Sequence, residues 1–332
     1  MKILDLFCGA GGFSHGFTAL SKNDHLSIDM DSSALKTYSL NYPRAKVWNT
    51  DIHDLHSIQI EEKLSGAPDI IIASPPCEEF SKANPESQRP SAERIYGEGT
   101  AKLLLDSIRI IGDLSPKVFV IENVAAILQF GGDEIILREF RRVGFDTVHF
   151  NMVRAHQNGN PSKRLRVFIS NIKLNLPRKT APTVMESIGD LPPLGPEHIL
   201  NPHETSPNHS IYPLSDDRLK AVRKTRWGQG ARFFRASKTR TLPNWVRLFP
   251  DRVSTSINGL SRYIHPYENR ILTVREHARL MSYPDTFTFN GPIDSQYNQV
   301  GESVPPLISQ LIAQEVGAYL GRITQEHLRS PS

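Results

Sequence analysis

Cysteine is scarce in this chain, which contains only Cys8 and Cys77 among its 332 residues. The two thiols lie in different sequence contexts, and in a reducing compartment we expect no structural disulfide between them. Two cysteines also exclude a zinc site built from several thiolates, so we expect no bound metal. Each thiol therefore needs its own explanation.

The sequence also lacks a long apolar segment near its start. Its first residues, MKILDLFCGAGG, have no basic region ahead of the short apolar run, and Asp5 interrupts that run. We therefore expect no signal peptide and no membrane span, and we expect a cytoplasmic protein. Internal repeats and low-complexity tracts are absent as well.

The positive charge of the chain is unevenly distributed, although the net charge is only +4. Between Ser215 and Arg270 the sequence has thirteen Lys or Arg residues and only four Asp or Glu residues. Such an excess favours a polyanionic partner such as nucleic acid. The alternative interpretation is a solvated surface that is basic without a binding role.

Short apolar runs alternate with helical patterns in the first half of the chain, as is typical of a parallel sheet with crossover helices. The predicted strands are 2–7, 25–30, 46–49, 69–74, 117–122 and 166–171, and the predicted helices are 12–20, 33–42, 100–114 and 133–143. The pattern predicts an α/β fold with a doubly wound, mostly parallel sheet.

Prolines recur between Pro177 and Pro213, which indicates an irregular segment outside the sheet. Helical patterns return after Thr273, and the segment VPPLISQLIAQEVGAYL carries one apolar stripe. We therefore predict a first domain over 1–171, a second, smaller lobe over 172–262, and a C-terminal return over 263–332 that completes the first domain.

A glycine-rich turn, Cys8 to Gly12, follows the first predicted strand and precedes a helix. Such a turn lets a ligand approach the backbone closely, but it fits a dinucleotide, S-adenosylmethionine or plain tight packing. Asp29 ends the second strand, where a carboxylate often binds ribose hydroxyls. Asp51 and Ile52 follow the third strand, where they suit an adenine ring. For each acid the alternative is a helix cap or a surface charge.

Two further strands end in reactive side chains. Cys77 follows the fourth strand in the segment PPCEEFS, and Glu122 with Asn123 ends the fifth. A thiol at this edge suits nucleophilic attack, whereas a buried small residue is the alternative. Glu122 suits proton donation to a ring nitrogen, and a strand-end salt bridge is its alternative. Asn123 is expected to hold the local backbone.

Arg164 and Arg166 begin the sixth predicted strand. At a spacing of two residues both side chains are expected to point the same way, toward the pocket. Guanidinium donors suit the exocyclic oxygen of a cytosine and an adjacent phosphate, although pairing with a carboxylate is the alternative.

These motifs together resemble the cytosine-5 DNA methyltransferases, and the resemblance runs from Lys2 to the last predicted helix. The motifs are DLFCGAGGF (5–13), IDMD (28–31), SPPCEEFS (74–81), ENV (122–124), RLRVFI (164–169), NRILTVREHARLMSYPDTF (269–287) and QVGESVPP (299–306). Single motifs of this kind are common, whereas the ordered set is specific.

The resemblance implies a DNA (cytosine-5-)-methyltransferase that uses S-adenosylmethionine and acts on double-stranded DNA. It implies catalytic roles for Cys77, Glu122, Arg164 and Arg166, with Cys77 as nucleophile. The implied cofactor-binding residues are Phe7, Gly9, Gly11, Asp29, Met30, Asp51, Ile52, Pro75, Ser303 and Val304. It further implies a mobile loop over 81–99, target recognition over 172–262, and a supporting role for 275–279.

The resemblance also indicates a prokaryotic restriction-modification or solitary enzyme that acts as a monomer. It leaves open a cognate restriction endonuclease that acts on the same site without a stable complex. Two positions depart from the family pattern: Ser162 replaces the usual Gln, and Glu302 replaces the usual Asn. Ser162 affects how the target phosphate is held, and Glu302 adds a negative charge near the cofactor's ammonium group. Two rivals remain, a tRNA cytosine-5 methyltransferase of the same fold and a non-catalytic DNA-binding relative.

Overall fold

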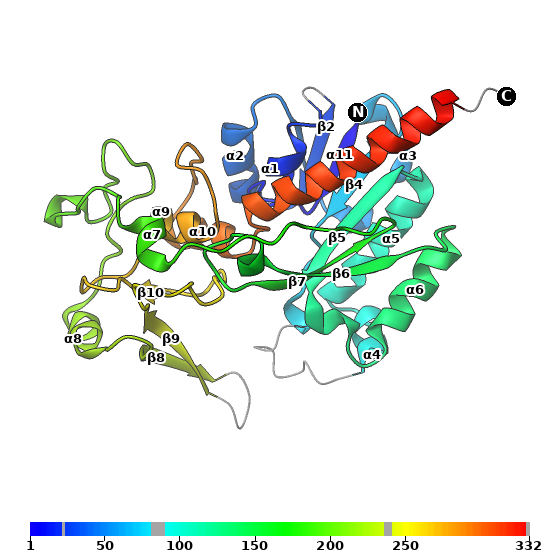
Figure 1. Cartoon of the computed structure of the whole chain (residues 1–332). Helices are drawn as coiled ribbons and strands as arrows, with labels where there is room; N and C mark the ends of the chain where they lie inside the picture. The colour runs from blue at the N-terminus through cyan, green and yellow to red at the C-terminus, as the bar shows by residue number, and fades with distance from the viewer. Residues whose placement is uncertain (22–23, 81–89, 236–240, 330–332) are drawn as a thin grey trace.

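A seven-stranded sheet forms the centre of the computed structural model, which describes residues 1–21, 24–80, 90–235 and 241–329 (Figure 1). Its strands are β1 (Ile3–Leu6), β2 (His25–Asp29), β3 (Lys46–Asn49), β4 (Ile70–Ala73), β5 (Val118–Val124), β6 (His149–Arg154) and β7 (Leu165–Ser170). Their order in the sheet is β3-β2-β1-β4-β5-β7-β6. Strands β1 to β5 are mutually parallel, while β7 runs antiparallel to both β5 and β6. The predicted α/β fold is confirmed.

Alternate side chains of the central strands point to opposite faces of the sheet, and each face has its own core. Leu4 and Ile71 lie on one face, under α3 (Ser57–Leu64), α5 (Leu103–Leu114) and α6 (Gly132–Arg142). Ile3 and Ile70 lie on the other face, under α1 (Ser14–Phe17) and α11 (Pro306–Arg329). Helices thus cover both faces, as the doubly wound pattern predicts.

The last helix returns to the first one. Ile308, Ile312 and Val316 of α11 are buried in the same core as Phe13 and Phe17. The Ser309 hydroxyl accepts a 2.9 Å hydrogen bond from the Gly16 amide and donates to the Phe13 carbonyl. The C-terminal segment therefore completes the large domain and passes close to the glycine-rich turn.

A smaller lobe lies to one side of the large domain (Figure 1). It contains a three-stranded sheet of β8 (Gly230–Arg235), β9 (Thr241–Arg247) and β10 (Tyr263–Ile264), together with α7 (Val184–Ile188) and α8 (Asp216–Lys224). Helix α9 (Val274–Leu280) packs against both α7 and α10 (Ile293–Gly301) in a shared core. Because β10 pairs with β9, the small sheet extends past residue 262, where we had expected the lobe to end.

Two local differences from the sequence prediction stand out. Strand β6 was not predicted, because its sequence HFNMVR is mostly half-buried or exposed and has little alternation. Helix α1 covers only Ser14–Phe17, shorter than the predicted 12–20.

Two short helices complete the large domain, α2 (Ser32–Asn41) and α4 (Ser91–Ile95). Among the described residues, no helix combines the length and the apolar character that a membrane crossing requires.

Candidate active site

The site is assembled where β1, β4 and β5 end. Parallel strands present their carboxyl ends at one edge of a sheet, and functional groups gather there. Strand β7 runs the opposite way, so its first residues reach the same edge: Arg166 lies opposite Val124, at the end of β5. Antiparallel pairing therefore brings Arg166 of β7, and Arg164 just before β7, to the carboxylate near the end of β5 and to the thiol that follows β4.

Glu122 and Arg166 form an ion pair in this crevice. Nε of Arg166 lies 2.8 Å from Oε1 of Glu122, and the two side chains are 17% and 9% exposed respectively. Nη1 of Arg166 also donates a 2.9 Å hydrogen bond to the Leu165 carbonyl. With little solvent around it, the pair is weakly screened.

Arg164 has a different set of partners. Its side chain is buried, and Nη1 donates to the carbonyl oxygens of Ile257 at 2.9 Å and Gly301 at 3.0 Å. These two carbonyls belong to the small lobe and to the end of α10. Arg164 thus joins three segments of the chain, whereas the sequence alone had suggested that both arginines face the substrate.

Electrostatics places the four predicted catalytic residues together. Burial lowers the pKa of Arg164, and the neighbouring Arg166 lowers it further. Glu122 and Cys77 act in the opposite direction, because negative charge on either group stabilises the guanidinium ion. Arginine remains charged at neutral pH even so. A permanent positive charge therefore stands near both the thiol and the carboxyl group.

Cys77 lies just beyond the end of β4, is partly buried and takes part in no disulfide bond. The backbone around it is fixed from β5, because Nδ2 of Asn123 donates a 3.2 Å hydrogen bond to the Pro75 carbonyl. The Asn123 Oδ1 atom accepts from the Val124 amide at 2.9 Å. Asn123 thus holds the local backbone, as its position suggested. Cys8 differs, since burial and the charges of Asp5 and Asp29 raise the pKa of its thiol.

The segment after Cys77 is anchored by residues that sequence reasoning missed. The Arg94 guanidinium lies 4.4 Å from the centre of the buried Phe80 ring. Nη1 of Arg94 donates to the Glu79 carbonyl at 3.2 Å, and Oε1 of Glu79 accepts from the Ala101 amide at 3.0 Å. Helix α4 is therefore tied back to the thiol-bearing segment. Residues 81–89 of the predicted mobile loop lie outside the described residues.

The glycine-rich turn adopts left-handed backbone at Phe7, Gly9 and Gly11, with φ of 58°, 51° and 95°. A Cβ added at Gly9 would have nothing within 4 Å, so open space lies above this residue. The Gly9 amide donates a 2.8 Å hydrogen bond to Oδ2 of Asp29, while Oδ1 accepts from the Asp31 amide at 2.8 Å. Burial raises the pKa of Asp29, and these hydrogen bonds oppose the shift.

Gly11 and Gly12 are surrounded by protein instead. A Cβ at Gly11 would approach Tyr42 to 2.4 Å and Tyr38 to 2.9 Å. A Cβ at Gly12 would meet the Tyr283 hydroxyl and the Val304 carbonyl, each at 2.5 Å. These two glycines let the aromatic residues and the C-terminal return pack onto the turn. Sequence spacing did not distinguish them from Gly9.

The other predicted cofactor residues have varied surroundings. Met30 is 68% exposed and leaves a free apolar surface beside Asp29. The Asp51 side chain accepts a 2.9 Å hydrogen bond from the His53 amide and caps a short helical turn. Ile52 is only 2% exposed and packs in the core. Pro75 and Val304 are buried, and the Ser303 hydroxyl donates to the Val300 carbonyl at 3.0 Å.

The two positions that depart from the family pattern both lie in packed surroundings. Ser162 is fully buried; its hydroxyl accepts from Nδ2 of Asn160 at 2.9 Å and lies 3.7 Å from the Met281 sulfur. These contacts are internal to the protein, and how the target phosphate is held stays a prediction. Glu302 lies against the small lobe, since a Cβ added at Gly259 would meet its Oε1 atom at 2.5 Å.

Polar residues behind the site hold the neighbouring segments of the chain in place. Arg275 is inaccessible and donates to the carbonyls of Pro207, Pro284 and Phe287. Arg279 pairs with Asp285 and with Asp190 of the small lobe. The segment 275–279 therefore connects the lobe to the C-terminal return, which agrees with its predicted supporting role.

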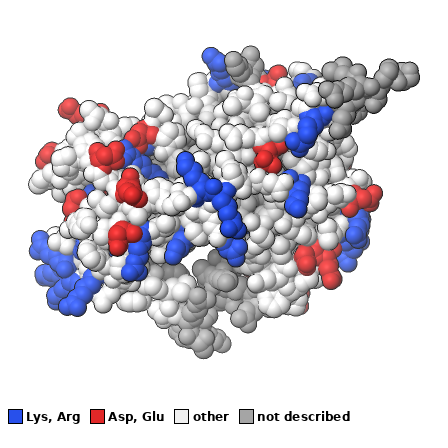
Figure 2. All heavy atoms as spheres, in the orientation of Figure 1, with Lys and Arg blue, Asp and Glu red and all other residues white. Residues whose placement is uncertain are grey.

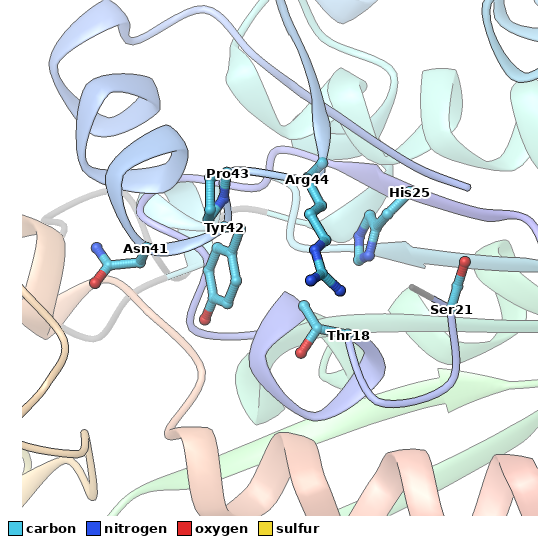
Figure 3. Close-up of a pocket in the computed structure, with 8 residues that line it drawn as sticks. Thr18, Ser21, His25, Asn41, Tyr42, Pro43 and Arg44 are labelled. Carbon is cyan, nitrogen blue, oxygen red and sulfur yellow. The ribbon is translucent and has the colours of Figure 1, made fainter. Parts of the chain in front are cut away.

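A separate pocket of about 240 Å³ lies at the opposite edge of the sheet, where β2 begins (Figure 3). Its lining residues are Thr18, Ser21, His25, Asn41, Tyr42, Pro43, Arg44 and Ala45. None of the predicted catalytic residues contributes to it, so this pocket is not the site that contains Cys77.

Comparison with known proteins agrees with these features. Residues 1–318 match the family described as C-5 cytosine-specific DNA methylase. The putative type II methyltransferase M.MJ0563P of Methanocaldococcus jannaschii is 39% identical, over 95% of this chain and 99% of that protein. A second one from the same organism, M.MjaORF1200P, is 38% identical over 95% and 98%. The type II methyltransferase M.DdeI of Desulfomicrobium norvegicum is 29% identical over 97% and 90%.

Solved structures share the fold at lower identity. A putative DNA modification methyltransferase encoded within an E. coli prophage has a TM-score of 0.75 at 22% identity, covering 97% of this chain and 99% of that chain. The S. pombe Dnmt2 methyltransferase has a TM-score of 0.61 at 17% identity, covering 96% and 99%. The sequence comparisons carry the identification: the chain belongs to the C-5 cytosine-specific DNA methylase family and is a DNA cytosine-5 methyltransferase.

Proposed function

We propose that the enzyme methylates carbon 5 of a cytosine swung out of duplex DNA, through a covalent adduct with Cys77 and with S-adenosylmethionine as methyl donor. The observation that carries this proposal is the grouping of Cys77, Glu122 and Arg166 around the buried Arg164. A thiol, a carboxyl group and two fixed positive charges are the groups that nucleophilic activation of a cytosine ring requires.

The first step uses Cys77 and Glu122. The Cys77 thiolate forms a bond to carbon 6, the electron pair of the 5,6 double bond shifts to the bond between carbons 4 and 5, and the electron pair of the 3,4 double bond shifts to ring nitrogen 3. Glu122, which first takes up a proton from solvent against the opposing charge of Arg166, delivers that proton to ring nitrogen 3 as this happens. Arg166 then stabilises the carboxylate that remains, because its Nε atom lies 2.8 Å from Oε1. The result is an enamine whose carbon 5 is nucleophilic.

The second step regenerates the enzyme. Bound S-adenosylmethionine would supply the methyl group that carbon 5 accepts, and S-adenosylhomocysteine would be the product that leaves. The proton on carbon 5 then leaves to solvent, the 5,6 double bond forms again, and Cys77 departs as a thiolate. Glu122 recovers its proton from ring nitrogen 3. Cys77 and Glu122 thus end in the protonation states from which they started.

The glycine-rich turn fits the proposed methyl donor. Open space above Gly9 admits a ligand close to the backbone, and Asp29 beside it suits ribose hydroxyls. The exposed Met30 offers an apolar surface for an adenine ring. We assign Phe7, Gly9, Asp29, Met30, Asp51 and Ser303 to this binding role. Gly11, Ile52, Pro75 and Val304 support it through packing.

Duplex DNA is proposed to lie between the two lobes, with the small lobe reading the recognition sequence. Extrusion of a base costs a few kcal/mol, which contacts to the remaining duplex offset. The small lobe offers cations beside aromatic rings: the guanidinium groups of Arg218 and Arg232 lie 5.8 and 5.1 Å from the Trp245 ring. Phe233 is 65% exposed and Trp227 is 47% exposed on the same lobe. Such surfaces suit stacking and phosphate contact.

The names of the relatives suggest a biological setting. The relatives are named type II methyltransferases, and we propose that a cognate endonuclease cleaves the site that this enzyme methylates. The two need not form a stable complex. We further propose that the enzyme acts as a monomer in the cytoplasm, because one pair of lobes encloses one extruded base.

The proposal is tested by methyl transfer from tritiated S-adenosylmethionine to mixed-sequence duplex DNA, with tRNA in parallel and bisulfite sequencing of the product. We expect label in DNA at cytosines within one recurring motif. Label only in tRNA would keep the chemistry and overturn the proposed substrate. Cofactor binding without any label would favour a non-catalytic DNA-binding role.

A further inference from the structure

An acid-free segment of the chain crosses the front of the large domain. From residue 147 to residue 185 the sequence contains no Asp or Glu, yet it contains seven Lys or Arg residues. Arg164 and Arg166 belong to the active site. Four of the others, Arg154, Lys163, Arg178 and Lys179, are all exposed, and we call them the basic stripe.

Backbone pairing gathers these four residues. Arg154 ends β6 and lies opposite Leu165 at the start of β7, so it is close to Lys163. The chain then returns across this edge: the Lys179 amide donates a 2.9 Å hydrogen bond to the Gln157 carbonyl, beside the bridge between Lys179 and Asn158. Arg178 is its neighbour. Segments more than twenty residues apart therefore place their cations on one surface.

Two further observations indicate that positive charge is concentrated at the basic stripe. Burial lowers the pKa of His156, and the charges of Lys163 and Arg154 lower it further, so both cations lie near this imidazole. Figure 2 shows a blue stripe running diagonally over the region of β6 and β7 toward the hollow between the lobes. Acidic side chains lie to its sides in this view, not within it.

The ion pairs found among the described residues include none of these four side chains. Like charges held together without internal counter-charges repel one another, and a polyanion relieves that repulsion. The stripe also adjoins the catalytic crevice, because Lys163 directly precedes Arg164. Duplex DNA that leaves the crevice therefore meets the Lys163 end of the stripe first.

We propose that the basic stripe binds backbone phosphates of duplex DNA that extends beyond the methylated site. This inference rests on the proposed function, since it takes DNA in the crevice as its starting point. The stripe carries no sequence information of its own, because phosphates are identical along the duplex. Its role is to add affinity for long DNA and to orient the duplex before the cytosine is extruded.

The test compares duplexes of two lengths, about 12 and about 30 base pairs, that carry the same unmethylated target motif. Binding is measured by fluorescence anisotropy over a range of salt concentrations for the wild type and for Arg178→Gln/Lys179→Gln. The matched control is Arg141→Gln/Arg322→Gln, which removes two exposed charges from α6 and α11. Thermal melting checks that all three proteins fold.

Each phosphate contact contributes about 0.9 to the slope of log K against log salt concentration. For the long duplex, we expect the slope of the stripe variant to be shallower than that of the wild type by up to about 1.8. Between about 50 and 200 mM salt, the loss of affinity should therefore be about tenfold smaller for the variant than for the wild type. Its affinity at low salt is expected to be weaker than that of the wild type. The short duplex, the control variant and kcat at saturating DNA should not change.

Equal effects on both duplexes would overturn the inference, because the stripe would then act within the site itself. An unchanged salt slope for the long duplex would also overturn the inference. The expected partner of the stripe would then be an acidic protein surface. Anisotropy reports binding without methyl transfer. An enzyme that binds long DNA as described but methylates only tRNA would therefore contradict the proposed function and not the stripe.

Discussion

Nε of Arg166 lies 2.8 Å from Oε1 of Glu122, at the point where antiparallel β7 meets the end of β5. This pair gives Glu122 a partner that stabilises its ionised form after a proton has moved to the substrate. The neighbouring Arg164 makes no such contact and instead donates to the carbonyls of Ile257 and Gly301. The two arginines thus differ in role, and their substitutions should have different effects.

Glu122→Gln is expected to reduce kcat by about 10² to 10⁴, the usual contribution of a positioned proton donor. The amide keeps the size of the side chain but cannot deliver the proton. Affinity for DNA should change little, because the fold and the phosphate contacts remain. Single-turnover methylation and anisotropy separate these effects, and a variant with normal kcat would contradict the role of Glu122.

Arg164→Met is expected to lower the free energy of unfolding by about 3 kcal/mol, because two buried carbonyls lose a charged donor. Arg166→Met should lower it less and should reduce kcat more, since its main partner is Glu122. Urea unfolding and steady-state kinetics on both variants give the comparison. Equal losses of stability would show that Arg164 does not have the joining role described above.

Gly9→Ala and Gly11→Ala should behave differently, although both glycines have positive φ. Alanine at residue 9 meets no atom within 4 Å, so the protein should fold at a cost of about 1 to 2 kcal/mol for the left-handed backbone. Its binding of S-adenosylmethionine should weaken, because the methyl group fills the open space. Alanine at residue 11 would clash with Tyr42 and Tyr38 and should unfold much more readily. Isothermal titration and thermal melting test both statements.

Asp5 predicts a dependence of stability on pH. Burial raises the pKa of Asp5 to about 8, and the charge of Asp29 adds to the shift while the hydrogen bond from Ser14 opposes it. The folded state keeps this proton up to about pH 8, whereas the unfolded chain releases it near pH 4. Folding is therefore penalised increasingly as the pH rises through this window.

Asp5→Asn removes that penalty and keeps the shape of the side chain. Relative to the wild type, its free energy of unfolding should rise by at most about 1.4 kcal/mol per pH unit between about pH 5 and pH 8. The difference should level off above pH 8. Asp146→Asn, at an exposed position, is the control. Parallel curves for Asp5→Asn and the wild type across this range would refute the assignment.

Much of the fold was predictable, because parallel strands that are buried on both faces have short, continuously apolar sequences. The runs that became β1, β4 and β5 each precede a motif residue, and parallel strands present those residues at one edge. The position of Cys77 and Glu122 in the site therefore follows from local patterns. Strand β6 did not follow, because its half-exposed sequence lacks the apolar signal.

The separate roles of Arg164 and Arg166 could not be predicted in this way. They depend on Ile257 and Gly301, which are 93 and 137 residues away from Arg164 in the chain. The same holds for Gly12, which leaves room for Tyr283 and Val304. Spacing within a motif reports local backbone geometry, whereas these contacts are set by how the small lobe and the C-terminal return pack onto the sheet.

The central claim is that Cys77 is the nucleophile, and Cys77→Ser tests it most directly. A hydroxyl is a much poorer nucleophile than a thiolate at neutral pH, so transfer of tritiated methyl to duplex DNA should fall to background. Binding of S-adenosylmethionine and of DNA should remain close to that of the wild type. Methyl transfer at the wild-type rate by this variant would contradict the account.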